Sequence, residues 1–451
     1  MASLSSIIFG RNYLTNSVLL FLCVLAFIYV VLMRKPSLNN SPFDDITNFE
    51  AEIENPKHAR VVAYKHRNRI EDKKLTETTS IDESVAPPIA EKKNVEHYRE
   101  IWLWADAKIT RDDLIPGDEA GVDVVLNALA TAPITHVGLL DIGSYESGTS
   151  QKWIIFLEGG QQAMMKLVWQ PEEKGFEKRD GACNFGFESP TSEIAAFHLH
   201  RILDFHNTPY VTGRKVKLSD IQAVSSPQVN KQFVRKGEKL CVVGGCYYCK
   251  GETTLCPSDG IVEVSIAYWV HRHLKLYTFP PKYMPFSTPR RDEWSKYGFN
   301  NDTYCKEVRK IPPYSSDWYY HDLFDFSLVD TIMHHYDSKH YVIHDHSKAH
   351  GLTVRLDHGR TFCSLSLDEY DVFLVPITQC CKIRKKTWKT IENFEEGDIS
   401  NRLKQSLKTD PIAPILLDAW YPVIERRLKK IKEVITKCAD ANGWDNVLVT
   451  A

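Results

Sequence analysis

The sequence lacks three features, each of which would point to a particular class of protein. Its formal net charge is −2 and its pI is about 6.8, so it has no excess of positive charge for binding nucleic acid. No segment repeats along the chain, which argues against a repeat architecture. No H-E-x-x-H pattern occurs, so the helical zinc-protease motif is absent. The hydrophobic content of 43% is that of an ordinary globular chain.

Long apolar runs are also scarce, and one stretch stands out, Leu14 to Met33. Its twenty residues are about what a helix needs to cross the hydrocarbon core of a bilayer. No small-residue cleavage site follows it, so we expect an uncleaved signal anchor at 14–33 behind a short cytoplasmic tail at 1–13. Arg34 and Lys35 outweigh Arg11, and these flanking charges oppose that orientation.

The cysteines favour a luminal domain. One of the eleven, Cys23, lies in the apolar run, and four others fall within sixteen residues: Cys241, Cys246, Cys249 and Cys256. In the cytosol this spacing would indicate a zinc knuckle, whereas in an oxidising compartment it would indicate two short-loop disulfides. Asn301 begins a glycosylation sequon beside Cys305. We therefore expect a single-pass type II membrane protein whose folded part lies in the lumen of the Golgi apparatus or a neighbouring compartment.

A polar segment separates the apolar run from the rest of the chain. Residues 34–96 are charged and short of aromatic runs, and they cannot bury enough apolar surface to fold. We expect them to form a mostly disordered stem. The remaining chain, 97–448, is long enough for two lobes or one large domain.

The folded part opens with helical patterns at 98–107 and 121–131 and continues with strand patterns at 153–157 and 162–169. Glu158-Gly159-Gly160 between the two strands predicts a hairpin turn. Lys166 lies in the second strand among apolar residues. Such a lysine is commonly an edge charge whose stem packs on apolar surface, but under a glycine hairpin it also suits a phosphate contact.

Two acids flank a predicted helix start. Ser189 followed by Pro190 is a typical N-cap and first helical residue. Glu188 precedes this start and Glu193 lies in the first turn, where acids compensate the helix dipole. If the helix packs across the sheet, Glu193 can instead reach Lys166.

Two aspartates follow in an order typical of phosphoryl transfer. Asp337 comes after an apolar helical stretch at 324–333, and Asp357 ends a strand-like run, LTVRL. One carboxylate would orient the acceptor hydroxyl and the other would hold a divalent ion on the phosphates. A competing hypothesis is a zinc hydrolase, because histidines are dense here: His334, His335, His340, His344, His346 and His350.

The chain from 97 to 448 resembles the FAM20 family of secretory-pathway kinases. The segments that carry the resemblance include LEGGQQAMMK, SEIAAFHLHRILDFHNTPYVTGR, CVVGGCYYC, VPITQCCKIRKKTW and RLKKIKEVITKCADANGWDNVLV. The resemblance implies an α+β, atypical two-lobed kinase-like fold with disulfides, an N-lobe at about 97–262 and a C-lobe at about 263–448. It also implies ATP with Mn²⁺ or Mg²⁺ as cofactors.

The resemblance assigns roles to individual residues. Asp337 matches the catalytic aspartate, Glu193 the acid that pairs with the nucleotide lysine, and the metal ligands would be Glu188 and Asp357. The residues expected to bind ATP are Lys166, Asp357 and the hinge-like stretch Ala267, Tyr268, Trp269 and Val270. The family's disulfide plan would pair Cys241 with Cys256, Cys246 with Cys249, Cys305 with Cys380, and Cys381 with Cys438. Cys183 and Cys363 have no place in that plan.

The chain departs from the family pattern at three places. A glutamate thought to contact the nucleotide is replaced by Val342, the residues between the two helix-start acids are Ser189-Pro190-Thr191, and an asparagine after the metal aspartate is His358. The four charged groups that the chemistry most needs are retained, so we favour an active enzyme. The alternative is a diverged pseudokinase that binds nucleotide or activates a partner.

Two substrate classes compete within the family: serine in secreted proteins, and the xylose of the proteoglycan linkage region. The segments CADANGWDNVLV, LEGGQ and CYYC look closer to the xylose-phosphorylating branch. We therefore expect a glycosaminoglycan xylosylkinase-like activity that transfers the γ-phosphoryl of ATP to the 2-hydroxyl of xylose.

Overall fold

The fold is described from a computed structural model. The structure describes residues 89–140, 150–167, 188–246, 254–272, 274–277, 298–338, 340–343, 351–362 and 364–450. Within these ranges no helix has both the length and the apolar character needed to span a bilayer. The expected tail and anchor at 1–33 and Cys183, Cys249 and Cys363 lie outside them.

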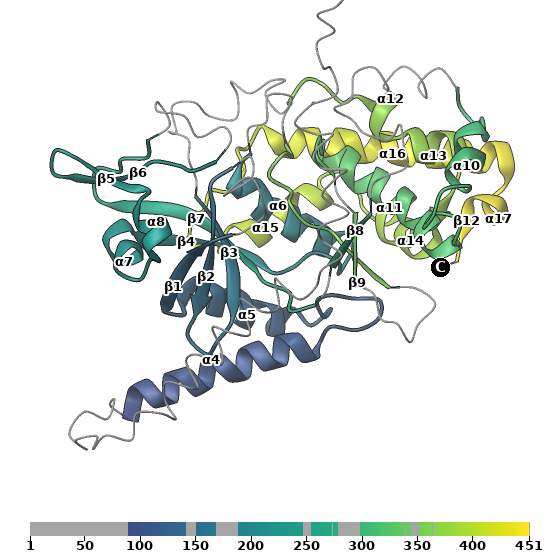
Figure 1. The fold of residues 1–451 in the computed structure, drawn as a ribbon. Helices are drawn as coiled ribbons and strands as arrows, with labels where there is room; N and C mark the ends of the chain where they lie inside the picture. The colour runs from purple at the N-terminus through teal and green to yellow at the C-terminus, as the bar shows by residue number, and fades with distance from the viewer. Residues whose placement is uncertain are drawn as a thin grey trace, which may run out of the picture. The chain divides into compact units, whose positions relative to one another are not determined.

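A five-stranded antiparallel sheet carries the first half of the folded unit (Figure 1). Its strand order is β1 (Ile134–Leu139), β2 (Lys152–Leu157), β3 (Gln162–Leu167), β7 (Ile261–Tyr268) and β4 (Val211–Lys217). The predicted hairpin joins β2 to β3, and both Gly159 and Gly160 have positive φ. A side chain at Gly159 would also meet the backbone of Arg99, so the turn requires glycine.

Three helices cover this sheet. The helix α4 (Ile89–Ala107) packs on α5 (Glu119–Thr131), which packs on β4 and β7. The helix α6 (Pro190–Ile202) also packs on β4 and β7. Short elements complete this part: α7 (Leu218–Ala223), α8 (Pro227–Asn230), β5 (Phe233–Lys236) and β6 (Lys239–Val242). Buried apolar side chains of the sheet, among them Ile155, Met165 and Ile266, belong to the main hydrophobic core.

The start of α4 corrects the expected stem. The helix begins at Ile89, whereas the stem was expected to continue to residue 96. The residues from Asn94 to His97 are exposed, so they gain little from burial. They continue a helix whose buried side chains, Trp102 and Ala105, come later, and composition alone did not reveal this.

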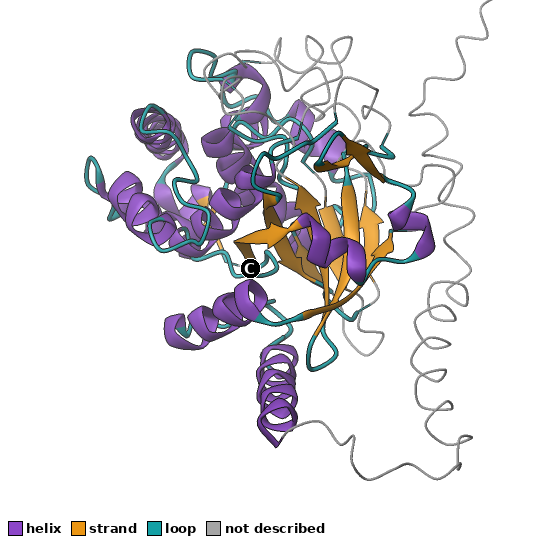
Figure 2. Cartoon of the chain, turned by 90° about the vertical axis from the view of Figure 1, so that its left-hand side faces the viewer, coloured by secondary structure: helices purple, strands orange, loops and turns teal. Residues whose placement is uncertain are grey.

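The second half of the unit is mainly helical, and Figure 2 shows most helices gathered on one side of the sheet. A central helix, α11 (Asp317–Met333), is buried along most of its length. Around it lie α10 (Thr303–Val308), α12 (Tyr370–Phe373), α13 (Val375–Cys380), α14 (Lys385–Glu392), α15 (Asp398–Leu407), α16 (Trp420–Asn442) and α17 (Trp444–Val447). Two small sheets pair β8 (Leu274–Tyr277), β9 (His340–Ile343) and β10 (Leu352–Val354), and β11 (Ile383–Arg384) with β12 (Leu448–Val449).

Three of the expected disulfides are confirmed: Cys241–Cys256, Cys305–Cys380 and Cys381–Cys438. Cys246 is disulfide-bonded as well. Because Cys241 and Cys256 are joined to each other, they are not thiolate ligands, and the zinc-knuckle hypothesis is wrong.

Candidate active site

Lys166 of β3 is the centre of a buried cluster of charge. Its side chain is 10% exposed, and its Nζ contacts three carboxylates. The distances are 2.5 Å to Glu193 Oε1, 2.7 Å to Asp357 Oδ1 and 3.4 Å to Glu188 Oε2. Four residues predicted separately from the sequence are therefore brought together from three parts of the chain: β3, the start of α6 and the segment after β10.

The charges in this cluster stabilise one another. Burial alone would lower the pKa of Lys166, but the nearby carboxylates, led by Asp357 and Glu193, raise it well above its usual value. Burial alone would raise the pKa of Glu193, but the attraction of Lys166 lowers it to about 2. Burial alone would also raise the pKa of Glu188, but the attraction of Lys166 outweighs burial and lowers it. The lysine is therefore protonated and the two glutamates are ionised at neutral pH.

The start of α6 fixes the two glutamates. Ser189 has an extended backbone and occupies the N-cap position, and Pro190 begins the helix, as predicted. The Ser189 N–H donates to the carbonyl of Gly359 at 2.7 Å. A Cβ at Gly359 would lie 2.9 Å from Glu188 Cβ, so the glycine allows the glutamate to pack against residues 357–360. The hydroxyl of Ser150 donates to Glu188 Oε2 at 2.5 Å.

Asp357 lies beyond the strand that was expected to end at it. The strand β10 ends at Val354, and Asp357 has a φ of +64°, in the left-handed region. The next backbone N–H, that of His358, donates to Glu193 Oε2 at 2.8 Å. Glu193 thus binds Lys166 with one oxygen and the segment after Asp357 with the other. Such backbone conformations are often retained at functional sites.

Asp337 lies beside the same segment, residues 357–360. It follows α11, and its backbone N–H donates to Nδ1 of His335 at 3.2 Å. The N–H of Tyr336 donates to the carbonyl of Arg360 at 3.0 Å, which joins the loop before Asp337 to the segment after Asp357. Arg360 Nε lies 3.8 Å from Asp337 Oδ2.

The hinge-like stretch closes the end of β7. Trp269 N–H donates to the carbonyl of Gln162 at 3.1 Å, and Gln161 Nε2 donates to the carbonyl of Trp269 at 2.9 Å. Ala267 pairs with Met164, two residues before Lys166 on β3. Tyr268 and Val270 are buried. The stretch is therefore held beside the strand that carries Lys166.

The carboxylates suit a hard divalent cation that is also bound by phosphate. Glu188 and Asp357 both contact Lys166 Nζ, and carboxylate oxygens are the donors that Mn²⁺ and Mg²⁺ prefer. Within the described ranges no group of three or more His, Cys, Asp or Glu side chains is arranged to hold a metal. Two carboxylates fit a cation whose remaining ligands are phosphate oxygens and water.

Sequence reasoning missed several residues of this region. Ser150, Arg360 and Glu369 contact the predicted residues or their neighbours, but no motif marks them. Glu369 accepts hydrogen bonds from His334 Nε2, at 2.9 Å, and from the hydroxyl of Tyr336. These contacts form between segments distant along the chain, so no local spacing could reveal them.

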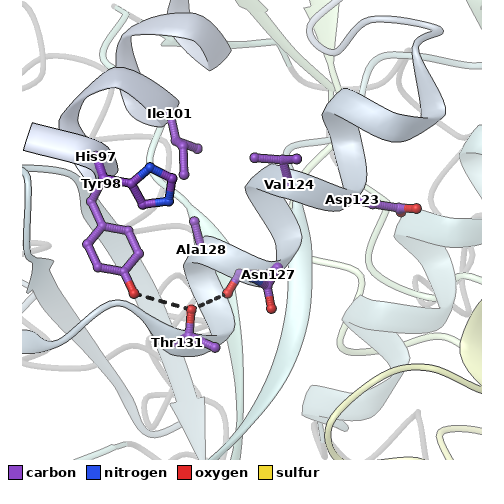
Figure 3. Close-up of a pocket in the computed structure, with 8 residues that line it drawn as sticks. All are labelled: His97, Tyr98, Ile101, Asp123, Val124, Asn127, Ala128 and Thr131. Atoms are coloured by element: carbon purple, nitrogen blue, oxygen red, sulfur yellow. Dashed lines mark hydrogen bonds between the residues drawn. The ribbon is translucent and has the colours of Figure 1, made fainter. Parts of the chain in front are cut away.

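A separate surface pocket of about 400 Å³ lies between α4 and α5 (Figure 3). Tyr98, Ile101 and Val124 contribute to its lining, and Tyr98 lies beside Thr131. None of the predicted site residues lines it, so it is distinct from the charged cluster.

The fold and the cluster together define a kinase-like protein, with a lysine on a sheet, acids at a helix start and two aspartates in the helical half. Residues 100–447 match the family model described as "Golgi casein kinase, C-terminal, Fam20". The chain therefore belongs to the Fam20 family.

Relatives with different activities resemble this chain to similar degrees. The human glycosaminoglycan xylosylkinase is 30% identical over 359 residues, which cover 77% of this chain and 82% of the relative. The human extracellular serine/threonine protein kinase FAM20C is 30% identical and covers 77% and 59%, respectively. The human pseudokinase FAM20A is 29% identical and covers 67% and 57%.

Solved structures share the fold. The structure of hydra Fam20 with sugar superposes with a TM-score of 0.69 at 25% identity and covers 78% of this chain and 98% of that one. The crystal structure of the Golgi casein kinase with Mn/ADP bound gives a TM-score of 0.65 at 24% identity and covers 84% and 91%.

Proposed function

We propose that this chain is a kinase that transfers the γ-phosphoryl of ATP to the 2-hydroxyl of xylose in the proteoglycan linkage region. The observation that carries the proposal is the charged cluster around Lys166. Asp357 of this cluster lies in the segment 357–360, and Arg360 of the same segment faces Asp337. The xylose acceptor is supported by the human and zebrafish xylosylkinases, each 30% identical and 82% covered by the match.

In this proposal each charged residue has one task. Lys166 binds the nucleotide phosphates, and Glu193 holds the lysine in place. Glu188 and Asp357 hold Mn²⁺ or Mg²⁺, which neutralises charge on the phosphates when bound. Asp337 orients the xylose hydroxyl and accepts its proton. Ala267, Tyr268, Trp269 and Val270 line the adenine site.

A pseudokinase is a second candidate, and two findings favour it. Val342 lies in β9 at a position where the family has an acid thought to contact the nucleotide, and the human FAM20A pseudokinase is 29% identical. Such a protein would bind nucleotide without turnover, so phosphate transfer must be measured as well as binding.

The experiment uses the purified luminal part with radiolabelled ATP and Mn²⁺, offered either a galactosyl-xylose acceptor or casein. We expect label on the sugar. Label on casein alone would indicate a serine kinase. Label on neither, with nucleotide still raising the melting temperature, would indicate the pseudokinase.

Asp337→Asn tests the site within the same assay. The variant keeps the shape of the side chain but removes its ability to accept a proton, so we expect at least about a hundredfold loss of kcat. Asp440→Asn is the matched control, because Asp440 is exposed on α16. Full activity in Asp337→Asn would overturn the assignment of the catalytic residue.

We also propose a type II arrangement in the Golgi membrane, with residues 14–33 as anchor and the kinase domain in the lumen. The three disulfides and the similarity to a family of Golgi kinases support this location. Because all of β7 pairs within the five-stranded sheet, we place the boundary between the lobes after Tyr268 rather than at 262.

Asn301 is the proposed glycosylation site. If Asn301 carries a glycan, glycosidase treatment should lower the mass of the wild type and of Thr303→Ser, which keeps the sequon. The same treatment should leave the mass of Asn301→Gln unchanged.

A further inference from the structure

Arg360 is a buried cation with few partners for its guanidinium. The side chain is 9% exposed, and its closest approach to a charged group is 3.8 Å, from Nε to Asp337 Oδ2. That distance is too long for a hydrogen bond, and Nε has no partner among the residues that the structure describes. A guanidinium has five N–H donors and no acceptor. A ligand with several acceptor oxygens would satisfy this group.

Other buried arginines of the chain are paired. Arg355 donates to Asp330, and Arg384 donates to Asp325 and to the carbonyl of Trp318. Arg427 donates to Asp368 and to the carbonyls of Ile332, Ser364 and Leu367. Burial of a cation is unfavourable unless hydrogen bonds and opposite charge compensate it. Arg360 therefore differs from the arginines that serve the fold.

The position of Arg360 indicates which anion it would meet. Three residues before it, Asp357 contacts Lys166, and one residue before it, Gly359 packs against Glu188. Arg360 itself faces Asp337. The backbone around Arg360 is held at two adjacent residues, because the carbonyl of Gly359 accepts from Ser189 and that of Arg360 accepts from Tyr336. Arg360 thus belongs to the segment that joins the proposed nucleotide side of the site to the acceptor side, and its guanidinium faces Asp337.

We propose that Arg360 is a further catalytic residue that donates hydrogen bonds to the γ-phosphoryl group as it is transferred. The inference rests on the proposed kinase function. In the reaction the bond from the γ-phosphorus to the ADP oxygen breaks, a bond to the xylose 2-oxygen forms, and the hydroxyl proton passes to Asp337. Arg360 exchanges no proton. Its planar fork stabilises the charge on the phosphoryl oxygens, which a lysine matches less well.

The test compares two nucleotides that differ by the terminal phosphate. Dissociation constants for a non-hydrolysable ATP analogue and for ADP, each with Mn²⁺, are measured by calorimetry for the wild type, Arg360→Gln and the exposed control Arg235→Gln. We expect Arg360→Gln to weaken binding of the ATP analogue about tenfold and binding of ADP less than twofold. In the xylose assay kcat should fall at least tenfold. Arg235→Gln should change neither.

The possible results distinguish a failure of the Arg360 proposal from a failure of the proposed kinase function. If Arg360→Gln lowers kcat but leaves the ratio of the two dissociation constants unchanged, the residue only positions Asp337 and the inference is overturned. If the wild type binds neither nucleotide, the proposed kinase function itself fails. If the glutamine variant does not fold, Arg360→Lys replaces it. A planar phosphate contact would then be contradicted if this variant kept both the wild-type kcat and the wild-type ratio of the dissociation constants for the ATP analogue and ADP.

Discussion

At the scale of single residues, Lys166 contacts three carboxylates that our proposal divides between two tasks. Glu193 also binds the backbone N–H of His358 and is 7% exposed, so it is tied into the fold on both oxygens. Glu188 contacts Lys166 only at 3.4 Å and lies next to Ser150 and Gly359. The first arrangement suits an ion pair, and the second suits a carboxylate that binds a metal.

This division predicts different responses to metal. In Glu188→Gln a metal ligand loses its charge, so the Mn²⁺ concentration for half-maximal activity should rise at least about tenfold. In Glu193→Gln the concentration should change little while kcat/KM for ATP falls, because the lysine loses its anchor. Titration of activity with Mn²⁺ measures both. Equal shifts in the two variants would contradict the separate roles.

Buried histidines predict a loss of stability in acid. Burial, with a smaller effect of Arg201, lowers the pKa of His198 to about 3, and burial also holds the pKa of His200 well below its usual value. The unfolded chain binds protons at these groups near pH 6.5, whereas the folded chain does not. Their contribution to stability is therefore present above about pH 6.5 and is lost as the pH falls, by up to about 1.4 kcal/mol per pH unit for each histidine.

Chemical denaturation at pH 7.5, 6 and 5 measures this slope. His198→Gln removes one titrating group and should reduce the slope by about one proton. Below about pH 4.3 the ionised Glu193, with its pKa of about 2, should add a second loss in the same direction. A stability that stays constant from pH 7.5 to 5 would contradict the assignment of neutral buried histidines.

At the scale of elements, the C-terminal helix α16 holds the loop that supports Asp337. Arg427 of α16 is fully buried and donates to Asp368 and to three backbone carbonyls. The next residue after Asp368 is Glu369, which accepts from His334 and Tyr336 just before Asp337. The helix is thus connected to the catalytic loop through two neighbouring acids.

Two adjacent arginines of α16 allow a matched comparison. Arg427→Met should lower the free energy of unfolding by about 3 kcal/mol. The buried carbonyls would lose their hydrogen-bond donor, and Asp368 would lose one of its two arginine partners. Arg426→Met should cost less than about 1 kcal/mol, since Arg426 binds the same carboxylate but is 47% exposed. Urea unfolding measures both values. Similar losses in the two variants would show that burial does not set the contribution.

Elements with a local signal could be predicted from the sequence. The Gly159-Gly160 turn and the start of α6 at Pro190 depend on backbone preferences of a few residues, and both were predicted correctly. The end of β10 at Val354 and the start of α4 at Ile89 were not, because neighbouring segments rather than local pattern decide where these elements end.

The site could be predicted in part. Spacing suggested that Glu193 reaches Lys166, but only the packing of α6 on the sheet brings the two within 2.5 Å. Local pattern made Lys166, Asp337 and Asp357 candidates, whereas the role of Glu188 as a metal ligand came from the family resemblance. Arg360 and Glu369 belong to no recognisable pattern, since their importance depends on contacts with residues far away in the sequence.

At the scale of the whole molecule, disulfides join segments that are distant in the chain. Cys305–Cys380 links α10 to the end of α13, and Cys381–Cys438 links the next residue to α16. The second bridge closes a loop of 57 residues, whereas Cys241–Cys256 closes one of 15. A longer loop restricts the unfolded chain more.

We expect the double variant Cys381→Ser/Cys438→Ser to lower the free energy of unfolding by about 4 kcal/mol, and Cys241→Ser/Cys256→Ser by about 3 kcal/mol. Guanidinium unfolding of each double variant measures the difference. Because Cys438 lies on the same helix as Arg427, the first variant should also lower kinase activity, and the second should not. The reverse order of activities would contradict a role of α16 in supporting the catalytic loop.

The adjacent Cys380 and Cys381 also affect how the protein must be produced and verified. Cys381 has a φ of +48° directly after α13, and this reversal sends the two neighbouring sulfurs to different partners, Cys305 and Cys438. A chain oxidised before that turn has formed can exchange the two partners. The exchanged isomer has the same mass and the same number of thiols as the native form. Recombinant samples should therefore come from a secretory host, and peptide mapping should establish the pairing before any activity is measured.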